Sequence, residues 1–287
     1  MTEFRRSFSG APWESRVGYC RSLRAGDRVF VTGTAPVSED GGVHAVGNGY
    51  RQAVRCFDII REALAAQGAR VVVAEIRQDD GERVAEEIRS QGGEALFAAA
   101  DVGSEASTLA LAEEVKKAFG GIDLLVNNAA IFGDMKMDSL IGIDYEYYQH
   151  FMNVNMNGAL LMTRACHRSM KERGGGAVVN QSSTAAWMGV GFYGLAKLGI
   201  NGVTHCLARE LGPVGIRVNA IAPGPTQTEA LQKTAGAYAQ QMVAQLPLGR
   251  LGNPSDLVDT CLFLLSDGAA WITGQIVNVD GGQITRP

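Results

Sequence analysis

Tyr193 and Lys197 lie four residues apart in a stretch of helical character, so one helical turn would bring the phenol and the ammonium together. A free phenol titrates near 10. A cation about 4 Å away, at an effective dielectric constant of about 20, contributes roughly 4 kcal/mol and would lower the tyrosine pKa by a few units. The pair therefore predicts an acid–base catalyst, Tyr193, activated by Lys197. Asn155 and Ser183 are the other two candidate catalytic residues.

The composition is that of a globular α/β protein. The chain has 287 residues, of which 46% are hydrophobic and 20% charged, and its formal net charge is −4. It fits one large domain or two small ones. Because it carries no basic block, we expect no nucleic-acid partner.

Cysteine, histidine and apolar residues predict no metal and no membrane span. The cysteines are odd in number and lack a Cys-x-x-Cys pair, which favours reduced thiols in a cytoplasmic protein: Cys20, Cys56, Cys166, Cys206 and Cys261. The four histidines show no metal-ligand spacing. No segment approaches 18 consecutive apolar residues, so we expect neither a membrane span nor export.

From residue 70 onward, short apolar runs alternate with amphipathic stretches, a pattern typical of a parallel sheet wrapped by helices. The expected strands, each apolar enough for burial on both faces, are Arg70–Glu75, Ala95–Ala100, Ile122–Val126, Ala177–Gln181, Arg217–Ile221 and Gln275–Val279. The expected helices are Gly81–Gln91, Ser104–Phe119, about Tyr145–Arg173, Tyr193–Leu211 and Pro254–Leu265. Residues 226–248 are expected to form a mobile helical flap over the site.

The first 69 residues follow another pattern. Tyr19–Leu23 and Arg28–Thr34 flank a glycine-containing loop and predict an antiparallel β-hairpin. A polar loop follows, and then a helix from about Tyr50 to Gln67, with Ala53, Phe57, Ile60 and Leu64 along one face.

Residues 70–287 resemble the short-chain dehydrogenase/reductase family, whose motifs occur here in the family's order. They are Asp101-Val102, Asn127-Asn128-Ala129-Ala130, Val154-Asn155, Asn180-Gln181-Ser182-Ser183, Tyr193 to Lys197, Asn219 to Gly224 with Thr228, Ile272-Thr273-Gly274 and Asp280-Gly281-Gly282. The resemblance implies a doubly wound, Rossmann-like α/β fold and a nicotinamide cofactor. It also implies a homodimer or homotetramer.

The family's glycine fingerprint, which opens the first helix beneath the pyrophosphate, is not found in residues 1–69. Val31-Thr32-Gly33 begins the motif, so Gly33 is a candidate cofactor contact, but the glycines of the following loop are wrongly spaced. This segment instead resembles the first half of the Rid family of reactive-intermediate deaminases, from Ser9 to Ala69. The chain therefore divides into a Rid-like segment, 1–69, supplying the first strand and helix, and a dehydrogenase-like core, 70–287.

The resemblance also implies which residues bind the cofactor. Glu75 would accept hydrogen bonds from the adenosine ribose and so favour NAD over NADP, although Arg77 could partly reverse that preference. The other candidate cofactor contacts are Asp101, Val102, Asn128, Ala129, Pro223, Gly224, Thr228, Tyr193 and Lys197. On the residues alone, Asn127 and Asn128 could equally form a turn.

For the reaction, the resemblance implies that Tyr193 exchanges the hydroxyl proton while hydride passes between the same carbon and nicotinamide. Ser183 would bind the substrate oxygen, Lys197 the nicotinamide ribose, and Asn155 a relay water. Trp187, Met188, Phe192, Ile131, Phe132 and Met135 would line an apolar substrate pocket, although core packing explains each of them equally well.

Three hypotheses follow. The first is an NAD-dependent oxidoreductase that interconverts an alcohol and a ketone on a small, fairly apolar molecule. The second is a non-catalytic or cofactor-impaired Rossmann-like protein, because the glycine fingerprint is missing. The third, an imine deaminase of the Rid kind, ranks last because half of that site is absent from the sequence.

Overall fold

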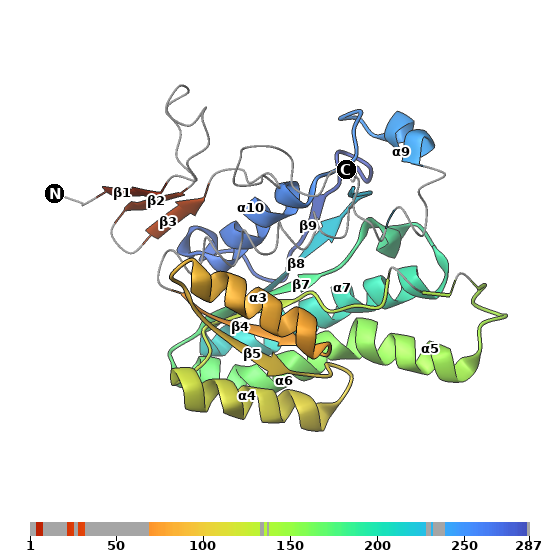
Figure 1. Ribbon diagram of the computed structural model, residues 1–287. Coiled ribbons are helices and arrows are strands. Elements are labelled where there is room, and N and C mark those ends of the chain that lie inside the picture. Colours follow the sequence, from red (N-terminus) through yellow and green to blue (C-terminus); the bar gives the residue numbers. More distant parts are fainter. Residues whose placement is uncertain are drawn as a thin grey trace.

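A parallel β-sheet with helices on both faces forms the main body of the chain (Figure 1). The computed structural model describes residues 4–7, 22–25, 28–31, 69–132, 135–136, 138–227, 231 and 239–285. The parallel strands are β4 (Arg70–Glu75), β5 (Glu94–Ala99), β6 (Leu124–Asn127), β7 (Gly176–Gln181), β8 (Ile216–Pro223) and β9 (Ile276–Val279). Strand β4 pairs with β5, and the others pair in the order β6-β7-β8-β9.

Helices connect these strands. They are α3 (Gln78–Ser90), α4 (Glu105–Phe119), α5 (Tyr145–Met152), the π-helix η1 (Asn153–Asn157), α6 (Gly158–Glu172), α7 (Gly191–Leu211), α9 (Ala239–Gln245) and α10 (Pro254–Leu265). Short 3-10 turns are η2 (Thr184–Trp187), η3 (Gly212–Val214) and η5 (Asp267–Ala269). The Rossmann-like α/β prediction is confirmed, with element ends shifted by a few residues.

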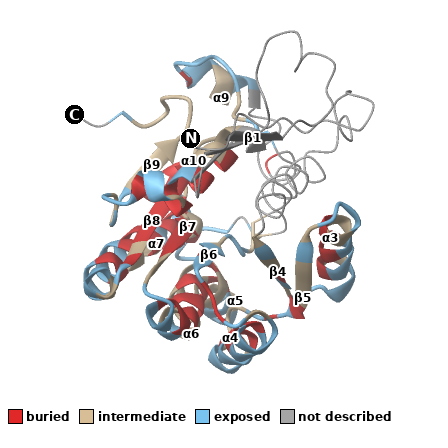
Figure 2. Cartoon of the chain, turned by 90° about the vertical axis from the view of Figure 1, so that its left-hand side faces the viewer, coloured by how far each residue is buried: buried red, intermediate tan, exposed pale blue. Residues whose placement is uncertain are grey.

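The side chains of β7 show how both sheet faces are covered. Val178 packs into one core cluster with residues of α4, α6 and α7, whereas its neighbours Ala177 and Val179 pack into another with residues of α10. Successive side chains of a strand point to opposite faces, so these clusters lie on opposite sides of the sheet. Figure 2 shows the corresponding helices on either side of the strands.

Strand β6 departs from the expected burial on both faces. Leu125 is buried in the α4–α6 cluster, but Leu124 and Val126 are 41% and 39% exposed. Parallel strands are normally covered on both faces and paired on both edges, whereas β6 pairs with β7 on one edge. Within the described ranges, no strand lies between β6 and β4. The expectation of full burial is therefore wrong for β6.

The beginning of the chain forms a separate antiparallel sheet of β1 (Phe4–Ser7), β2 (Ser22–Ala25) and β3 (Arg28–Val31) (Figure 1). The β2–β3 pairing confirms the predicted hairpin, while β1 was not anticipated. Strand β3 was expected to be the first strand of the parallel sheet, but it pairs with β2 instead. The helix expected near residues 50–67 lies outside the described residues, and the division at residue 69 stays a prediction.

Candidate active site

Helix α7 carries the predicted tyrosine–lysine pair on one face. Lys197 is 4% exposed, and its Nζ donates a hydrogen bond to the carbonyl oxygen of Gln181 at 2.9 Å. The same Nζ lies 5.8 Å from the centroid of the Tyr193 ring. The four-residue spacing therefore places both groups beside the end of β7, as the helical period requires.

Ser183 completes this arrangement from the segment after β7. Its Oγ accepts a hydrogen bond from the Ala185 N–H at 3.2 Å and thereby caps the short helix η2. A hydrogen bond also joins the side chains of Ser183 and Tyr193. Three of the four predicted catalytic residues thus lie together.

The electrostatics differ from the sequence-based expectation. Burial raises the pKa of Tyr193 above its ordinary value, and the hydrogen bond with Ser183 acts in the opposite direction. Burial also lowers the pKa of Lys197 to about 8. The prediction that Lys197 lowers the tyrosine pKa is therefore wrong here, because desolvation of the phenol dominates and raises the pKa of Tyr193.

Asn155 lies in the π-helix η1, between α5 and α6, and is 2% exposed. Its Oδ1 accepts a hydrogen bond from the Ile131 N–H at 2.6 Å, and its Nδ2 donates to the Ile131 carbonyl at 2.9 Å. This double contact fixes the chain after β6 against the helix. The π-helical turn, a feature often found at functional sites, was missed because an uninterrupted helix was expected.

The predicted adenosine contacts follow the first two parallel strands. Glu75 ends β4, and its Oε1 accepts a hydrogen bond from the Arg77 N–H at 3.0 Å and pairs with the Arg77 guanidinium at 3.7 Å. Asp101 follows β5, and its Oδ1 accepts from the Gly103 N–H at 2.8 Å. Val102 packs so closely on Gly158 that a Cβ there would lie 2.9 Å from the valine methyl group.

Asn127 has a structural role that the sequence did not reveal. Its Nδ2 donates to Asn180 Oδ1 at 2.8 Å, and Asn180 Nδ2 in turn donates to Thr204 Oγ1 at 2.9 Å. This chain of hydrogen bonds ties β6, β7 and α7 together. Asn128 and Ala129, the predicted cofactor contacts, follow as exposed residues. The asparagines at the ends of two predicted strands, Asn127 and Asn180, were the only signal of this contact in the sequence. They become neighbours because the strand register places them directly opposite each other.

Pro223 and Gly224 end β8 beside the end of β9. Gly224 N–H donates to the Val279 carbonyl at 3.1 Å, and a Cβ at Gly224 would lie 2.7 Å from Asp280. Glycine is therefore required here by close packing of the backbone. Thr228 and Gly33 lie outside the described residues, so their predicted cofactor contacts stay predictions.

Aromatic and aliphatic side chains surround the tyrosine. The Phe132 ring packs against the Tyr193 ring with centroids 5.0 Å apart, and Phe192 lies edge-on to Phe151 at 4.7 Å. The same cluster contains Ile131, Met135, Ile143, Tyr147, Tyr148, Met152 and Met156. Four of the six residues predicted to line an apolar pocket, Ile131, Phe132, Met135 and Phe192, thus pack around Tyr193 or its neighbours.

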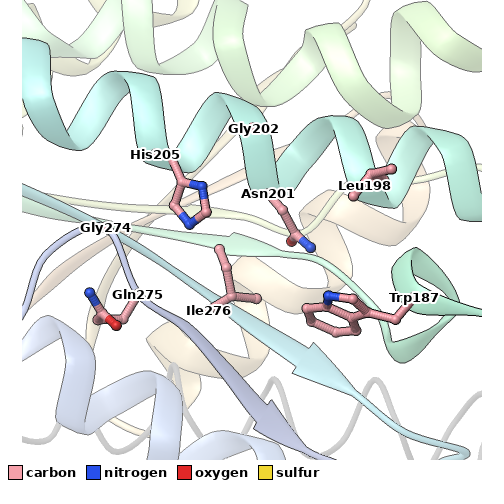
Figure 3. A pocket seen from close by; sticks show the side chains of 8 residues that line it. All are labelled: Trp187, Leu198, Asn201, Gly202, His205, Gly274, Gln275 and Ile276. Atoms are coloured by element: carbon pink, nitrogen blue, oxygen red, sulfur yellow. The ribbon is translucent and has the colours of Figure 1, made fainter. Parts of the chain in front are cut away.

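Trp187 and Met188 are placed differently. Trp187 lines a separate cavity of about 460 Å³ between α7 and the beginning of β9, together with Leu198, Asn201, Gly202, His205, Gly274, Gln275 and Ile276 (Figure 3). Met188 is 51% exposed. Trp187 ends the turn η2 and Met188 follows it, and the sequence did not show the direction of this turn.

Several candidate contacts for a dinucleotide follow the carboxyl ends of β4, β5, β6 and β8, which is the edge where α/β sheets bind ligands. The buried Lys197 and the carboxylates of Glu75 and Asp101 fit the two ribose-bearing ends of such a molecule. The described residues contain no glycine-rich turn for the pyrophosphate between those ends.

Comparison with known proteins assigns the family. A family model described as "Enoyl-(Acyl carrier protein) reductase", which represents short-chain dehydrogenases, matches residues 59–283. The chain belongs to the short-chain dehydrogenase/reductase family. This oxidoreductase is 53% identical over 247 residues to an uncharacterized oxidoreductase of Mycobacterium tuberculosis, covering 86% of this chain and 96% of the relative.

Two further similarities involve hydroxysteroid dehydrogenases. A 3alpha-hydroxysteroid dehydrogenase of Mediterraneibacter gnavus is 39% identical to this short-chain dehydrogenase. The matched region covers 61% of this chain and 70% of the Mediterraneibacter protein. A solved 7 alpha-hydroxysteroid dehydrogenase, complexed with NADH and 7-oxo glycochenodeoxycholic acid, is 32% identical with a TM-score of 0.72, covering 79% of this chain and 89% of that one. These similarities do not support the Rid resemblance of residues 1–69, which stays a prediction.

Among the residues that the structure describes, no helix of this oxidoreductase is both long enough and apolar enough to cross a membrane.

Proposed function

We propose that the chain is an NAD-preferring dehydrogenase that interconverts a secondary alcohol and a ketone on a small, fairly apolar substrate. The observation that carries this proposal is the grouping of Tyr193, Ser183 and the buried Lys197 at the end of β7. A buried lysine lowers stability unless its charge serves a bound partner, and such perturbed groups cluster at functional sites.

The chain's own residues would divide the work as follows. Ser183 Oγ holds the substrate oxygen, and the phenol of Tyr193 exchanges a proton with that oxygen. When bound, nicotinamide would accept or donate the hydride. Lys197 Nζ would bind the nicotinamide ribose, and Asn155 would hold the backbone at Ile131 in place. Because its pKa is raised, Tyr193 carries its proton at neutral pH and is suited to protonating a ketone during reduction.

A preference for NAD rests on Glu75. Its carboxylate would accept hydrogen bonds from ribose hydroxyls and repel a 2′-phosphate. Arg77, paired with Glu75 and with Asp80, works against this preference, so NADP stays an alternative cofactor. Titrating wild type and Glu75→Ala with NADH and with NADPH tests the preference. We expect the variant to lose affinity for NADH while its affinity for NADPH stays equal or improves.

The apolar wall around Tyr193 supports the substrate class. The partly buried Phe132, Ile131 and Met135 beside Tyr193 present apolar groups rather than charges, and aliphatic or aromatic ligands gain affinity from burial against such surfaces. The hydroxysteroid dehydrogenases among the similar proteins act on alcohols of apolar ring systems by their names. Cyclic secondary alcohols and their ketones are therefore the first compounds to test.

The deciding experiment compares Tyr193→Phe with Tyr145→Phe, the same chemical change at a residue that is 69% exposed. NADH oxidation is followed with a panel of cyclic ketones. We expect Tyr193→Phe to lose at least about a thousandfold in kcat, within the range of general acid–base catalysis, while Tyr145→Phe retains wild-type activity. Turnover by Tyr193→Phe at the wild-type rate would refute the mechanism.

A cofactor-impaired protein is the second candidate. It is favoured by the pairing of β3 with β2, since that strand was expected next to the pyrophosphate. If NADH at millimolar concentration does not bind the wild-type chain, this second candidate replaces the first. Release of ammonia from a 2-iminoacid would instead support the Rid-type deaminase.

Assembly and location are further proposals. Helix α7 exposes an uncharged stripe that includes Leu195 and Leu198, which are 40% and 50% exposed, and Gly202. Burying this stripe across a two-fold axis would produce a homodimer, or a homotetramer if a second axis is used. Light scattering after size-exclusion chromatography tests the assembly.

The unpaired cysteines Cys166 and Cys261, both buried, accord with a cytoplasmic location.

A further inference from the structure

Ser182 is a buried polar residue directly after β7 that the proposed reaction does not use. It is 2% exposed, and its backbone N–H donates to the Ile221 carbonyl at 2.8 Å, which continues the pairing with β8. Its Oγ donates a hydrogen bond to Asn201 Oδ1 of α7 at 2.6 Å. A buried hydroxyl is costly unless the fold supplies a partner, and here the partner is another buried side chain.

The Ser182–Asn201 pair lies in the protein interior. Asn201 is 5% exposed and follows Lys197 by one turn of α7. The Lys197 carbonyl oxygen lies 3.2 Å from the same Ser182 Oγ and accepts a share of its proton. Among the described residues, the buried side-chain oxygen that lacks a partner belongs to Asp259, so the Ser182–Asn201 pair leaves no buried polar atom unpaired.

The residues on either side of Ser182 contact the same helix. The Gln181 carbonyl accepts a hydrogen bond from Lys197 Nζ at 2.9 Å. On the other side, a hydrogen bond joins the side chains of Ser183 and Tyr193. Three successive residues at the end of β7 therefore contact three successive turns of α7. The central contact, made by Ser182, fixes the separation of the two elements for the contacts beside it.

We propose that Ser182 and Asn201 are positioning residues, whose hydrogen bond holds the end of β7 against α7 and so keeps Ser183 within hydrogen-bond reach of Tyr193. The catalytic consequence of this positioning rests on the proposed function. Neither side chain of the pair takes part in the proposed proton exchange, so the pair stays in place while the reaction proceeds. A displacement of about 1 Å at a reacting group can lower a rate about a hundredfold, so a directional contact suits this role.

A second contact between β7 and α7 should keep the fold intact when the Ser182–Asn201 pair is removed. Asn180 Nδ2 donates to Thr204 Oγ1 at 2.9 Å, and both side chains are buried. This contact lies one helical turn further from the catalytic groups. Loss of the Ser182–Asn201 pair should therefore loosen the site more than the sheet.

Two variants remove the pair from its two sides. Ser182→Ala deletes the donor, and Asn201→Leu replaces the acceptor by a side chain of similar size. Asn201 borders the cavity between α7 and β9, which gives the leucine room (Figure 3). Ser169→Ala is the matched control, because Ser169 of α6 is also buried and its Oγ accepts one hydrogen bond, from the Ile122 N–H at 3.0 Å. Ile122 precedes β6, at the opposite end of the sheet from the catalytic groups.

NMR of the protein labelled at the Cζ atoms of its tyrosines reports the contact between Ser183 and Tyr193 without cofactor. Tyr193→Phe identifies the Tyr193 signal, and Ser183→Ala shows where that signal lies when the hydrogen bond is lost. We expect Ser182→Ala and Asn201→Leu to move the signal in the direction of Ser183→Ala, and Ser169→Ala to leave it in place. A signal at the wild-type position in both variants would overturn the proposal. Failure of both variants to fold, while Ser169→Ala folds, would also overturn it, because the pair would then hold the fold rather than the site.

Kinetics with NADH and a cyclic ketone measure the catalytic consequence. We expect kcat to fall at least about tenfold in Ser182→Ala and in Asn201→Leu, with KM for the ketone within about twofold of wild type, because the reacting groups are displaced while the apolar surface is kept. The double variant should lose no more than the larger single loss, since both changes remove one contact. An active wild type with equal kcat in both variants would overturn the proposal. A moved Tyr193 signal without turnover by wild type would support the positioning role and refute the proposed function.

Discussion

Lys197 places a titratable group in the protein interior beside the Gln181 carbonyl and the Tyr193 ring. Its pKa falls from 10.5 to about 8, a difference that corresponds to an unfavourable contribution of about 3 kcal/mol to folding at neutral pH. This cost supports the proposal that Lys197 binds a partner such as a ribose. The burial of Lys197 thus connects the stability of the protein with the proposed chemistry.

Replacing Lys197 with methionine should stabilise the protein without cofactor. The variant removes the buried charge and loses one hydrogen bond, which contributes about 1 kcal/mol, so we expect a gain of about 2 kcal/mol at pH 7. Denaturant unfolding measures it. Lys117→Met, at an exposed position on α4, is the control and should change stability by less than about 0.5 kcal/mol. A loss of stability in Lys197→Met would show that the ammonium is well accommodated.

The difference between wild type and Lys197→Met should depend on pH in a defined direction. Because the folded pKa is depressed, the unfolded chain binds more protons between pH 8 and 10.5, and wild-type stability rises over this window relative to the variant. The penalty is fully present below pH 8 and absent above 10.5. Unfolding curves from pH 7 to 10 check this, and a constant difference between the two proteins would contradict it.

At the scale of elements, apolar runs in the sequence were enough to locate all six parallel strands, because a strand in a parallel sheet is recognised mainly by its continuous apolar residues. The start of α3 was missed by three residues, since the helix was expected from Gly81 and begins at Gln78. A side chain at Gly81 would collide with the ring of Phe97, so glycine is required inside the helix by packing. The π-helix at Asn155 and the Asn127–Asn180–Thr204 network depend on contacts between distant segments, which periodicity does not report.

Arg217 holds the end of α10 against β8. Its guanidinium donates hydrogen bonds to the carbonyl oxygens of Leu264, Leu265 and Ser266 at 2.7 to 3.3 Å. These carbonyls lie at the helix end, where a cation is favourable.

Arg217→Met should therefore lower the free energy of unfolding by about 2 to 4 kcal/mol, because it removes charge-assisted hydrogen bonds and leaves the carbonyls unpaired. Chemical denaturation measures the loss. Arg209→Met, at an exposed position in the last turn of α7, should cost less than about 1 kcal/mol. Equal losses for the two variants would argue against this role of Arg217.

At the scale of the molecule, the family motifs identified the family and the fold of the core, and the catalytic residues that they imply stay a prediction, whereas the first segment could not be placed from sequence. The run Val29 to Gly33 suits a central parallel strand and a hairpin equally well, and local pattern does not choose between partners. The pairing of β3 with β2, and the separate β4-β5 and β6-β7-β8-β9 sheets of the described residues, are therefore findings of the structure.

The most direct test of the account is a fluorescence titration of NADH against wild type, Lys197→Met and Lys117→Met. We expect saturable binding to wild type and Lys117→Met, and at least about tenfold weaker binding to Lys197→Met, because a charge-assisted hydrogen bond to the ribose is lost. Equal affinity of all three proteins for NADH, or no binding to wild type at millimolar cofactor, would contradict the claim that the buried lysine and its tyrosine serve a nicotinamide dinucleotide.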